Sequence, residues 1–466
     1  MNFKGLNICV LQPDYSTSTV DYKNYDPKRN LSHLIPEANF THIFLNKLST
    51  YAQLKKLKKQ NFDIFVNLCE GYLEWSIPSI DVIFNLDLLN LPYSGSTLDL
   101  YDPPKKIMKY VAYCQNVNTP KYLYINKKEA LAELNVNIPF PLFVKPGKAG
   151  DSLGIDKNSK VENILELKNQ ALKIFEEFDD VLIEEYIPGR EFTVLVIADP
   201  FNKKHPLALE PIEYNFPLNY EYKTYSLKTS ELHPLANKPC FDTALSNRLK
   251  EASIKIFNGF EGKGYARLDF RLSADNILYF LEINFACSVF YTNGMEGSAD
   301  FILQNNSLQV SGFLKKIIEE GITRFKSNEK LFEIIKTENN GYGIFANQDI
   351  PAETLIFKGE GKPHRLVSLD YVNQNWTPDE IKDFKRYAYP IANNIYVLWD
   401  SNPNEWAPQN HCCDPNTYYK GLDVYSSKNI YKNEELTLNY KSFLDSTMEP
   451  FECNCNSENC RGEIKN

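Results

Sequence analysis

Apolar residues recur in short runs along the first hundred positions, separated by polar stretches. The runs with the length and content of buried strands are residues 6–11, 43–45, 63–68 and 92–95. The stretch 51–60 has helical composition. Alternation of strand and helix is typical of a small parallel sheet with covering helices. We therefore predict a first α/β domain over residues 1–104.

The pattern changes from residue 105 onward. A helix is predicted near residues 109–115, ending before Thr119-Pro120. Further apolar runs predict strands at residues 141–144, 181–183, 192–197, 266–272 and 277–283. These elements indicate an α+β domain over residues 105–312. A helical pattern at residues 314–324 and a polar stretch after it predict a linker helix over residues 313–330.

Beyond residue 331 the apolar runs are short and turn residues are frequent. Only residues 377–386 have helical composition, so a domain built mainly of short strands is expected. We assign this domain to residues 331–448 and a C-terminal tail to residues 449–466. The predicted fold class is multidomain, α/β followed by β.

Composition narrows the classes of partner. The 466 residues carry a net charge of -9 with 43% hydrophobic and 24% charged residues, which allows several buried cores. An acidic chain lacks the basic face that phosphate backbones require, so no nucleic-acid partner is expected. The start of the chain lacks signal-peptide features, and no segment reaches roughly eighteen apolar residues. We expect a cytoplasmic protein with no membrane partner.

Five of the ten cysteines crowd the C-terminal part of the chain. Three of them form a Cys-x-Cys-x4-Cys tail, and a fourth, Cys413, lies upstream next to Cys412. Four thiolates satisfy a tetrahedral structural zinc ion, whereas a pair of disulfides is the alternative. A cytoplasmic setting favours zinc. The predicted zinc ligands are Cys413, Cys453, Cys455 and Cys460.

A glycine-rich loop follows the strand predicted at residues 141–144. It runs from Lys145 to Gly154 and includes Gly150 and Ser152. Backbone N–H groups of such a loop can hold an anion, with Lys145 as a fixed positive charge. The spacing is not that of a P-loop, and a surface hairpin is the alternative.

Two carboxylates and an amide are predicted to lie together on neighbouring strands. Asp269 lies on one strand, and Glu282 and Asn284 share one face of the next because alternate side chains point the same way. Oxygen ligands of this kind suit Mg²⁺. A solvated polar face is the alternative, but the apolar neighbours favour a pocket.

The order of these residues resembles the ATP-grasp ligases, with D-alanyl-D-alanine ligase the most similar type, over about residues 6–305. The resemblance implies ATP and Mg²⁺ as cofactors and a set of ligands for them. These are Lys109, Lys145, Gly150 and Ser152 for the phosphates, Glu184, Glu185 and Ile187 for the adenine hinge, Glu191 for the ribose, and Asp269, Glu282 and Asn284 for Mg²⁺. Arg267 would stabilise the developing oxyanion. The implied reaction forms an acyl phosphate that an amine then attacks.

Two segments depart from that ligase pattern. Residues 11–16 lack the glutamate that grips the first D-alanine, and residues 285–291 lack the Pro-Gly loop that contacts the second. Nucleotide use follows from the resemblance, and D-alanine as substrate does not. Small amino acids or peptides are the expected substrates.

The C-terminal motifs resemble the SET-domain methyltransferases with a post-SET zinc tail, over about residues 331–462. The resemblance implies S-adenosylmethionine bound by Gly341, Gly343, Asn410, His411 and Phe451. Tyr440 would orient the acceptor amine, which we expect to be a lysine, with a protein as a further substrate. Leu438 replaces the Phe or Tyr that often limits the number of methyl groups, so that number stays open.

Together these features predict a bifunctional enzyme, an ATP- and Mg²⁺-dependent carboxylate-amine ligase fused to a methyltransferase with structural zinc. One alternative is a protein-lysine methyltransferase whose ATP-grasp part is a nucleotide-binding recognition module. Another is a working ligase whose SET domain only binds a peptide.

Overall fold

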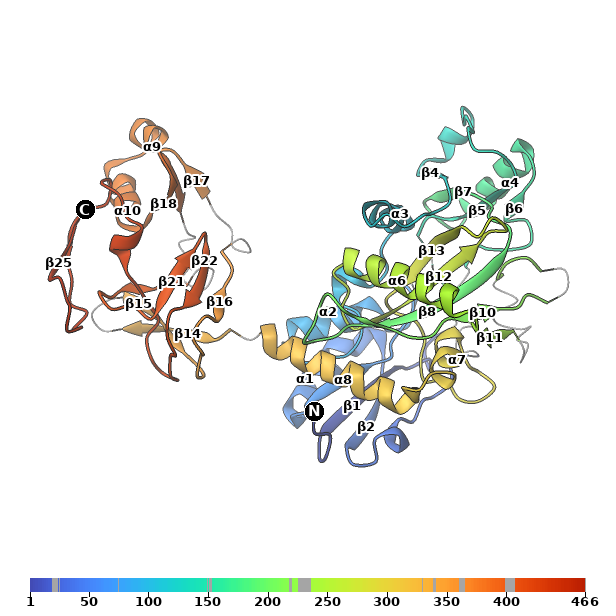
Figure 1. The fold of residues 1–466 in the computed structure, drawn as a ribbon, viewed down its shortest axis with the longest axis horizontal. Helices are drawn as coiled ribbons and strands as arrows, with labels where there is room; N and C mark the ends of the chain where they lie inside the picture. Colours follow the sequence, from blue (N-terminus) through green and yellow to red (C-terminus); the bar gives the residue numbers. More distant parts are fainter. Residues whose placement is uncertain are drawn as a thin grey trace. The chain divides into compact units, whose positions relative to one another are not determined.

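The computed structural model describes residues 1–18, 24, 26–73, 75–148, 150, 153–217, 220–224, 236–328, 330–337, 341–359, 365–398 and 407–465. The chain divides into two units, Met1–Ser327 and Asn328–Asn466 (Figure 1). Among the helices of the described ranges, none has the length and apolar character needed to cross a membrane.

A parallel three-stranded sheet opens the first unit, in the order β2-β1-β3. Its strands are β1 (Asn7–Pro13), β2 (Asn39–Leu45) and β3 (Ile64–Asn67). Ile8 and Val10 pack on one face with helix α8 (Gln309–Asn328). Cys9 and Leu11 pack on the other face with α1 (Thr50–Leu57) and α2 (Ile80–Leu88). Burial on both faces explains the continuous apolar run at residues 6–11 and confirms the predicted sheet.

The strand predicted at residues 92–95 is reduced to one parallel bridge between Phe65 and Tyr93. Pro92 has no N–H for a continued ladder, and Gly95 has a φ of +91, which turns the chain. Proline and glycine therefore end the pairing that the apolar pattern alone predicts.

Two antiparallel sheets form the rest of the first unit. The four-stranded sheet has the order β4-β7-β5-β6, with strands Tyr122–Ile125, Val181–Glu185, Leu142–Pro146 and Lys160–Val161. Helix α4 (Ile164–Ile174) packs on it, and both share a core that includes Val144, Leu167 and Ile183. The buried strands β5 and β7 carry Lys145 and Glu184 to their ends.

The six-stranded sheet has the order β11-β10-β8-β12-β13, with β9 also paired to β8. Its bounds are β8 (Arg190–Ile197), β9 (Leu207–Ala208), β10 (Ile212–Tyr214), β11 (Asn237–Pro239), β12 (Tyr265–Leu272) and β13 (Leu278–Asn284). Helices α3 (Lys105–Cys114) and α6 (Thr243–Gly259) share its apolar core (Figure 1). Helix α7 (Ser298–Gln304) follows the loop after β13.

Helix α8 belongs to the first unit for most of its length. Phe313, Leu314, Ile317 and Ile318 are fully buried in the core that also contains β1 and β3. The predicted linker helix at residues 313–330 is thus a packed helix through its apolar part, and the division between units falls after Ser327. The apolar face of a helix is stabilised by packing on its own domain, so this part of the helix is not a free linker.

The second unit consists of small sheets. Their strands are β14 (Phe332–Thr337) with β15 (Gly341–Ala346), β16 (Leu355–Phe357) with β22 (Asp423–Ser426) and β21 (Thr417–Lys420), β17 (Arg365–Val367) with β19 (Ile395–Leu398) and β18 (Tyr389–Ala392), β20 (Asn410–His411) with β23 (Thr437–Leu438), and β24 (Phe451–Glu452) with β25 (Glu463–Ile464). A core that includes Ile344, Val424 and Leu436 lies among them.

The described part of this unit contains the α-helices α9 (Leu369–Asn375) and α10 (Pro378–Tyr387). A capping box between Thr377 and Glu380, with Pro378 at the first helical position, starts α10 where the sequence predicts a helix. The prediction missed α9, which has only seven residues and too short a pattern to show helical periodicity.

Candidate active sites

Three charged side chains meet at the base of a pocket in the first unit. The Nζ atoms of Lys109 on α3 and Lys145 on β5 each lie 2.5 Å from a carboxylate oxygen of Glu184 on β7. All three residues are buried. Two ammonium groups against one carboxylate leave a net positive charge, which is the polarity that phosphate oxygens require.

Burial and pairing act in opposite directions on these groups. Burial lowers the pKa of Lys109 to about 8, against the charge of Glu184, which raises it. Burial also lowers the pKa of Lys145, but the carboxylates of Glu184, Glu282 and Glu191 together outweigh burial, so that pKa lies above its usual value. Burial raises the pKa of Glu184, and the two lysines more than offset that effect. Lys145 is therefore the permanent cation and Lys109 the titratable one.

The pocket above this cluster has aromatic and acidic walls. The Phe143 and Tyr222 rings meet edge to face at 4.9 Å. The lining residues are Pro120, Phe143, Lys145, Ile155, Glu184, Glu185, Tyr186, Ile187, Glu191, Tyr222, Lys223, Asp269, Arg271, Leu281 and Glu282. An apolar slot with a charged end fits a nucleotide. The predicted hinge and ribose residues all line this one pocket.

Glu191, predicted at the ribose, has two cationic neighbours that the sequence reasoning missed. Arg271 Nη2 lies 3.1 Å and Lys223 Nζ 3.0 Å from its carboxylate oxygens. Arg267, Asp269 and Arg271 are alternate residues of β12, and alternate side chains point to the same face of a strand. This spacing could have predicted that Arg271 lies in the site. Lys223 lies outside any strand or helix, so no periodicity marks it.

The residues predicted for Mg²⁺ are direct neighbours across two paired strands. Asp269 on β12 is opposite Glu282 on β13, and Arg267 is opposite Asn284, which confirms that the strands are adjacent. Asp269 Oδ1 is buried and accepts no hydrogen bond from any described residue. A buried carboxylate oxygen without a donor fits a cation ligand, so the oxygen set suits Mg²⁺.

Charge keeps Asp269 ionised despite its burial. Burial raises the pKa of Asp269, but the nearby charges of Arg267 and Lys223 bring it below its usual value. Arg267 Nη2 lies 3.2 Å from Asp269 Oδ2. Across the strand pair, Lys105 Nζ lies 3.6 Å from Glu282 Oε2. Arg267 is thus next to the acidic pair, as the proposed oxyanion role needs.

The glycine-rich loop after β5 is anchored at two points. The Tyr72 hydroxyl accepts the Gly150 N–H at 2.7 Å, and Asp180 Oδ1 accepts the Lys148 N–H at 3.1 Å. A Cβ on Gly147 would lie 2.8 Å from Asp180, so glycine is required for this approach. The prediction for Ser152 lies outside the described residues.

Residues 285–291, one of the two departures from the ligase pattern, contact a buried ion network. Arg29 donates to Asp26 at 2.7 Å, to Glu70 at 3.3 Å and to the Val289 carbonyl at 3.3 Å. The Ser288 hydroxyl donates to Glu70. Arg29 thus links Asp26 and Glu70 to the segment after β13. Sequence patterns could not reveal this cluster, because its members lie far apart along the chain.

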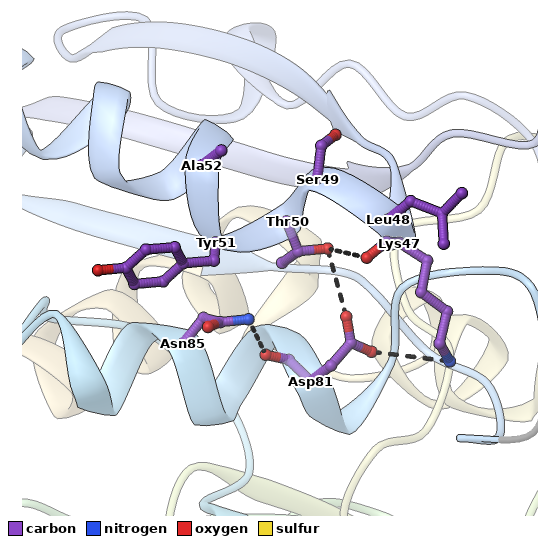
Figure 2. A pocket seen from close by; sticks show the side chains of 8 residues that line it. All are labelled: Lys47, Leu48, Ser49, Thr50, Tyr51, Ala52, Asp81 and Asn85. Carbon is purple, nitrogen blue, oxygen red and sulfur yellow. Dashed lines mark hydrogen bonds and ion pairs between the residues drawn. The ribbon is translucent and has the colours of Figure 1, made fainter.

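Another hollow lies between α1 and α2 (Figure 2). Its polar groups satisfy one another: the Thr50 hydroxyl donates to Asp81 at 3.3 Å, and Lys47 Nζ lies 3.9 Å from the same carboxylate. Asn85 Nδ2 donates to the Asp81 carbonyl at 2.8 Å. We therefore assign no function to this hollow.

The second unit brings the predicted donor-binding residues Gly343 and Asn410 close together, although their strands β15 and β20 belong to different sheets. Asn410 Nδ2 donates to Glu435 Oε1 at 2.7 Å. A Cβ on Gly343 would lie 2.5 Å from that oxygen and 3.0 Å from Asn410 Nδ2, and Gly341 has a φ of +75. Only glycine permits this turn and this close approach. A backbone cradle of this kind fits the amino-acid end of S-adenosylmethionine.

His411, Tyr440 and Phe451 form an aromatic cluster next to this turn. Their ring centroids lie 5.5 to 5.9 Å apart. The Tyr440 hydroxyl donates to the Gln409 carbonyl at 2.5 Å. Burial, with help from the Arg461 charge, lowers the pKa of His411, so its ring is neutral at pH 7. The tail that carries Phe451 thus completes the cluster.

Four sulfur atoms converge beside that cluster. The Sγ atoms of Cys413, Cys453, Cys455 and Cys460 all lie within 4.8 Å of one another. Strand β24 pairs with β25, and the Cys453 N–H donates to the Gly462 carbonyl at 2.9 Å, which closes the tail into a loop. Backbone N–H groups of Cys413 and Arg461 point at Cys455 and Cys413 sulfurs at 3.4 Å. A tetrathiol set with such donors fits structural zinc.

Comparison with known proteins finds one family match in each unit. Residues 112–289 match the family described as the D-ala D-ala ligase C-terminus, and residues 341–441 match the SET domain. The first unit is therefore similar to D-alanine–D-alanine ligases, and the second unit is similar to SET domains. The predicted resemblances and fold class are confirmed.

Individual relatives agree with this assignment. The D-alanine–D-alanine ligase of Aquifex aeolicus is 32% identical over 203 residues, covering 43% of this chain and 64% of that protein. D-alanine–D-alanine ligase B of Clostridium perfringens is 28% identical over 247 residues, covering 51% and 75%. The structure of the VanG D-Ala:D-Ser ligase from Enterococcus faecalis matches with a TM-score of 0.50 and 17% identity, covering 68% and 100%. The structural likeness supports the fold alone.

Proposed function

We propose that the first unit is an ATP- and Mg²⁺-dependent carboxylate-amine ligase. The observation that supports this proposal is the opposition of charge in one pocket. Lys145 lies at its base, Lys109 lies behind it on Glu184, and Asp269 lies beside Glu282 on its wall. A nucleotide triphosphate needs both, because cations bind its phosphate oxygens and carboxylates hold the metal that bridges them.

The proposed reaction uses these groups in sequence. Lys109 and Lys145 would hold phosphate oxygens of ATP, while Asp269, Glu282 and Asn284 would hold Mg²⁺, which neutralises developing charge. A substrate carboxylate attacks the γ-phosphorus and releases ADP, giving an acyl phosphate. A neutral amine then attacks the acyl carbon, phosphate leaves, and the amine proton is lost. Arg267 would stabilise the tetrahedral oxyanion.

The substrates we propose are small amino acids or peptides. The Arg29, Asp26 and Glu70 network lies against residues 288–289, just after the strand that carries Glu282 and Asn284. The relatives of this unit are named D-alanine–D-alanine ligases, so their named substrate is an amino acid. This supports amino compounds over simple carboxylic acids.

A phosphate-release screen across amino acids and small peptides tests the ligase proposal. We expect at least one pair to stimulate ATP hydrolysis and to yield an amide product, and Lys145→Ala to abolish both. Lys148→Ala, whose side chain is not part of the ion cluster, is the matched control. ATP hydrolysis that no added amino acid or peptide stimulates would instead favour the nucleotide-binding recognition module.

We propose methyl transfer from S-adenosylmethionine to an amine as the function of the second unit. The observation that supports this proposal is the cluster of His411, Tyr440 and Phe451 beside the Gly343 turn. The Tyr440 hydroxyl, fixed on the Gln409 carbonyl, would orient the acceptor nitrogen. A lysine has an ordinary pKa of about 10.4, and aromatic walls that exclude water favour its neutral, nucleophilic form.

The acceptor we propose is a lysine side chain of a protein or a peptide. Labelled S-adenosylmethionine with candidate peptides tests the transfer, and peptides with lysine replaced by arginine are the control. Label that appears equally in the arginine peptides would overturn the lysine assignment. Binding of lysine peptides with no transfer at all would favour a SET domain that only binds.

We also propose that the product of the ligase is the substrate of the methyltransferase. They share a single chain, and an amide-forming step can leave an amine available for methylation. Incubating the whole protein with ATP, S-adenosylmethionine and the ligase substrates should give a methylated ligation product. Ligation products that are never methylated would remove this coupling and leave each activity intact.

A further inference from the structure

Glu435 lies inside the candidate donor site, although neither resemblance assigns it a role. Its backbone is fixed on two sides: it forms a β-bridge with Phe345, and its carbonyl accepts from Asn416 Nδ2 at 2.9 Å. Its Oε1 accepts from Asn410 Nδ2 at 2.7 Å. The carboxylate is therefore held in place by the residues around it.

The same oxygen lies against the Gly343 backbone. A Cβ there would be only 2.5 Å away, so the carboxylate occupies the space beside the glycine turn. No lysine, arginine or histidine of the described ranges forms an ion pair with Glu435, whose side chain is partly buried. A cation bound beside the glycine turn would therefore pair with this carboxylate.

We propose that Glu435 binds the α-ammonium group of the methyl donor. This inference rests on the proposed methyltransferase function. The donor carries two cations, the sulfonium and the α-ammonium. The sulfonium has to face the acceptor beside Tyr440, on the side of His411. Asn410 and His411 are successive residues of β20, so their side chains point to opposite faces of that strand. Glu435 accepts from Asn410 and therefore lies on the face away from His411, where we place the α-ammonium group.

Calorimetric binding to the whole chain tests the assignment with three ligands. S-adenosylmethionine has both cations, S-adenosylhomocysteine has only the ammonium, and 5′-methylthioadenosine has neither. Glu435→Gln keeps the side chain's shape and its acceptor for Asn410. We expect it to weaken the first two ligands alike, by about tenfold or more, and to leave the third unchanged.

Glu434→Gln is the matched control, because this neighbouring carboxylate is exposed and accepts the Tyr431 N–H at 2.7 Å. It should leave all three affinities unchanged. If Glu435→Gln weakened the binding of S-adenosylmethionine alone, Glu435 would be assigned to the sulfonium and the proposal would be overturned. The proposal would also be overturned if the substitution weakened the binding of all three ligands equally, or of none. Wild-type protein that binds no donor would overturn the methyltransferase function itself, which separates the two failures.

Discussion

His411 Nδ1 accepts a hydrogen bond of 3.1 Å from the backbone N–H of Tyr440. A neutral imidazole that accepts at one nitrogen carries its proton on the other, and His411 Nε2 lies 3.4 Å from Cys413 Sγ. The ring thus connects a predicted zinc ligand to the residue predicted to orient the acceptor. Loss of the zinc tail should therefore disturb the acceptor site as well as the donor site.

Tyr440→Phe removes the hydroxyl that donates to the Gln409 carbonyl and keeps the aromatic packing. We expect methyl transfer to fall about a hundredfold, because the acceptor nitrogen loses its orienting group. Donor affinity, measured by calorimetry, should change little. Tyr418→Phe, which loses a surface hydrogen bond to Glu353, is the control. Unchanged transfer in Tyr440→Phe would remove its assigned role.

Asp269→Asn keeps the shape of the side chain and removes the charge that we assign to Mg²⁺ binding. Asp269 is buried, so a carboxylate on the protein surface cannot take its place as a metal ligand. ATP-dependent product formation should fall about a hundredfold or more, with a higher Mg²⁺ requirement. A magnesium titration of phosphate release measures both.

The control for this substitution is Asp275→Asn, in the exposed turn between the same two strands. It should retain wild-type turnover. A loss of turnover equal to that of Asp269→Asn would show that the strand pair, and not the metal ligand, had been disturbed.

The sequence predicted those parts of the sites that follow from local periodicity. Asp269 and Glu282 lie on successive strands with a short turn, so their pairing follows from the hairpin pattern. The cysteine tail is equally local, and its convergence with Cys413 followed from the need for a fourth ligand.

Groups that meet through tertiary packing left no such signal. Arg29 reaches Val289 across 260 positions, and Lys223 lies in a segment without periodicity. The apolar stripe of α8 was visible, but periodicity states that a face is buried without stating against which domain. Apart from the cysteine cluster, groups that are far apart in the chain were predicted to meet only where a family resemblance brought them together, as for Lys109 with Asp269 and Gly343 with Asn410.

Nucleotide binding should depend on the protonation of Lys109. Because burial lowers the pKa of this lysine to about 8, it is charged below that pH and neutral above it. The pKa of Lys145 is raised, so its charge persists. We expect the affinity for ATP to weaken about tenfold as pH rises from 7 to 9.5.

Calorimetric titrations with ATP across this range measure the pH effect. Lys109→Met should bind ATP weakly at every pH and show no step near 8. Lys106→Met, a substitution of the exposed neighbour on α3, should preserve the wild-type profile. A pH step that survives in Lys109→Met would assign the titration to another group.

Removing one zinc ligand should disable the second unit and spare the first. Cys460→Ser leaves three thiolates, which weakens the metal and releases the loop between β24 and β25. Because that loop follows directly on β24, whose Phe451 packs against His411, donor binding should be lost and the unfolding temperature of this unit should fall by more than about 5 °C. Calorimetric unfolding and donor titration measure the two effects.

Cys412→Ser is the matched control, because this thiol lies next to Cys413 but outside the four-sulfur cluster. It should keep both the unfolding temperature and donor affinity. ATP-dependent phosphate release should be unchanged in both variants, since the ligase site lies wholly within Met1–Ser327. Full donor binding by Cys460→Ser would show that the tail positions Phe451 without metal, and the cysteines would then need another explanation.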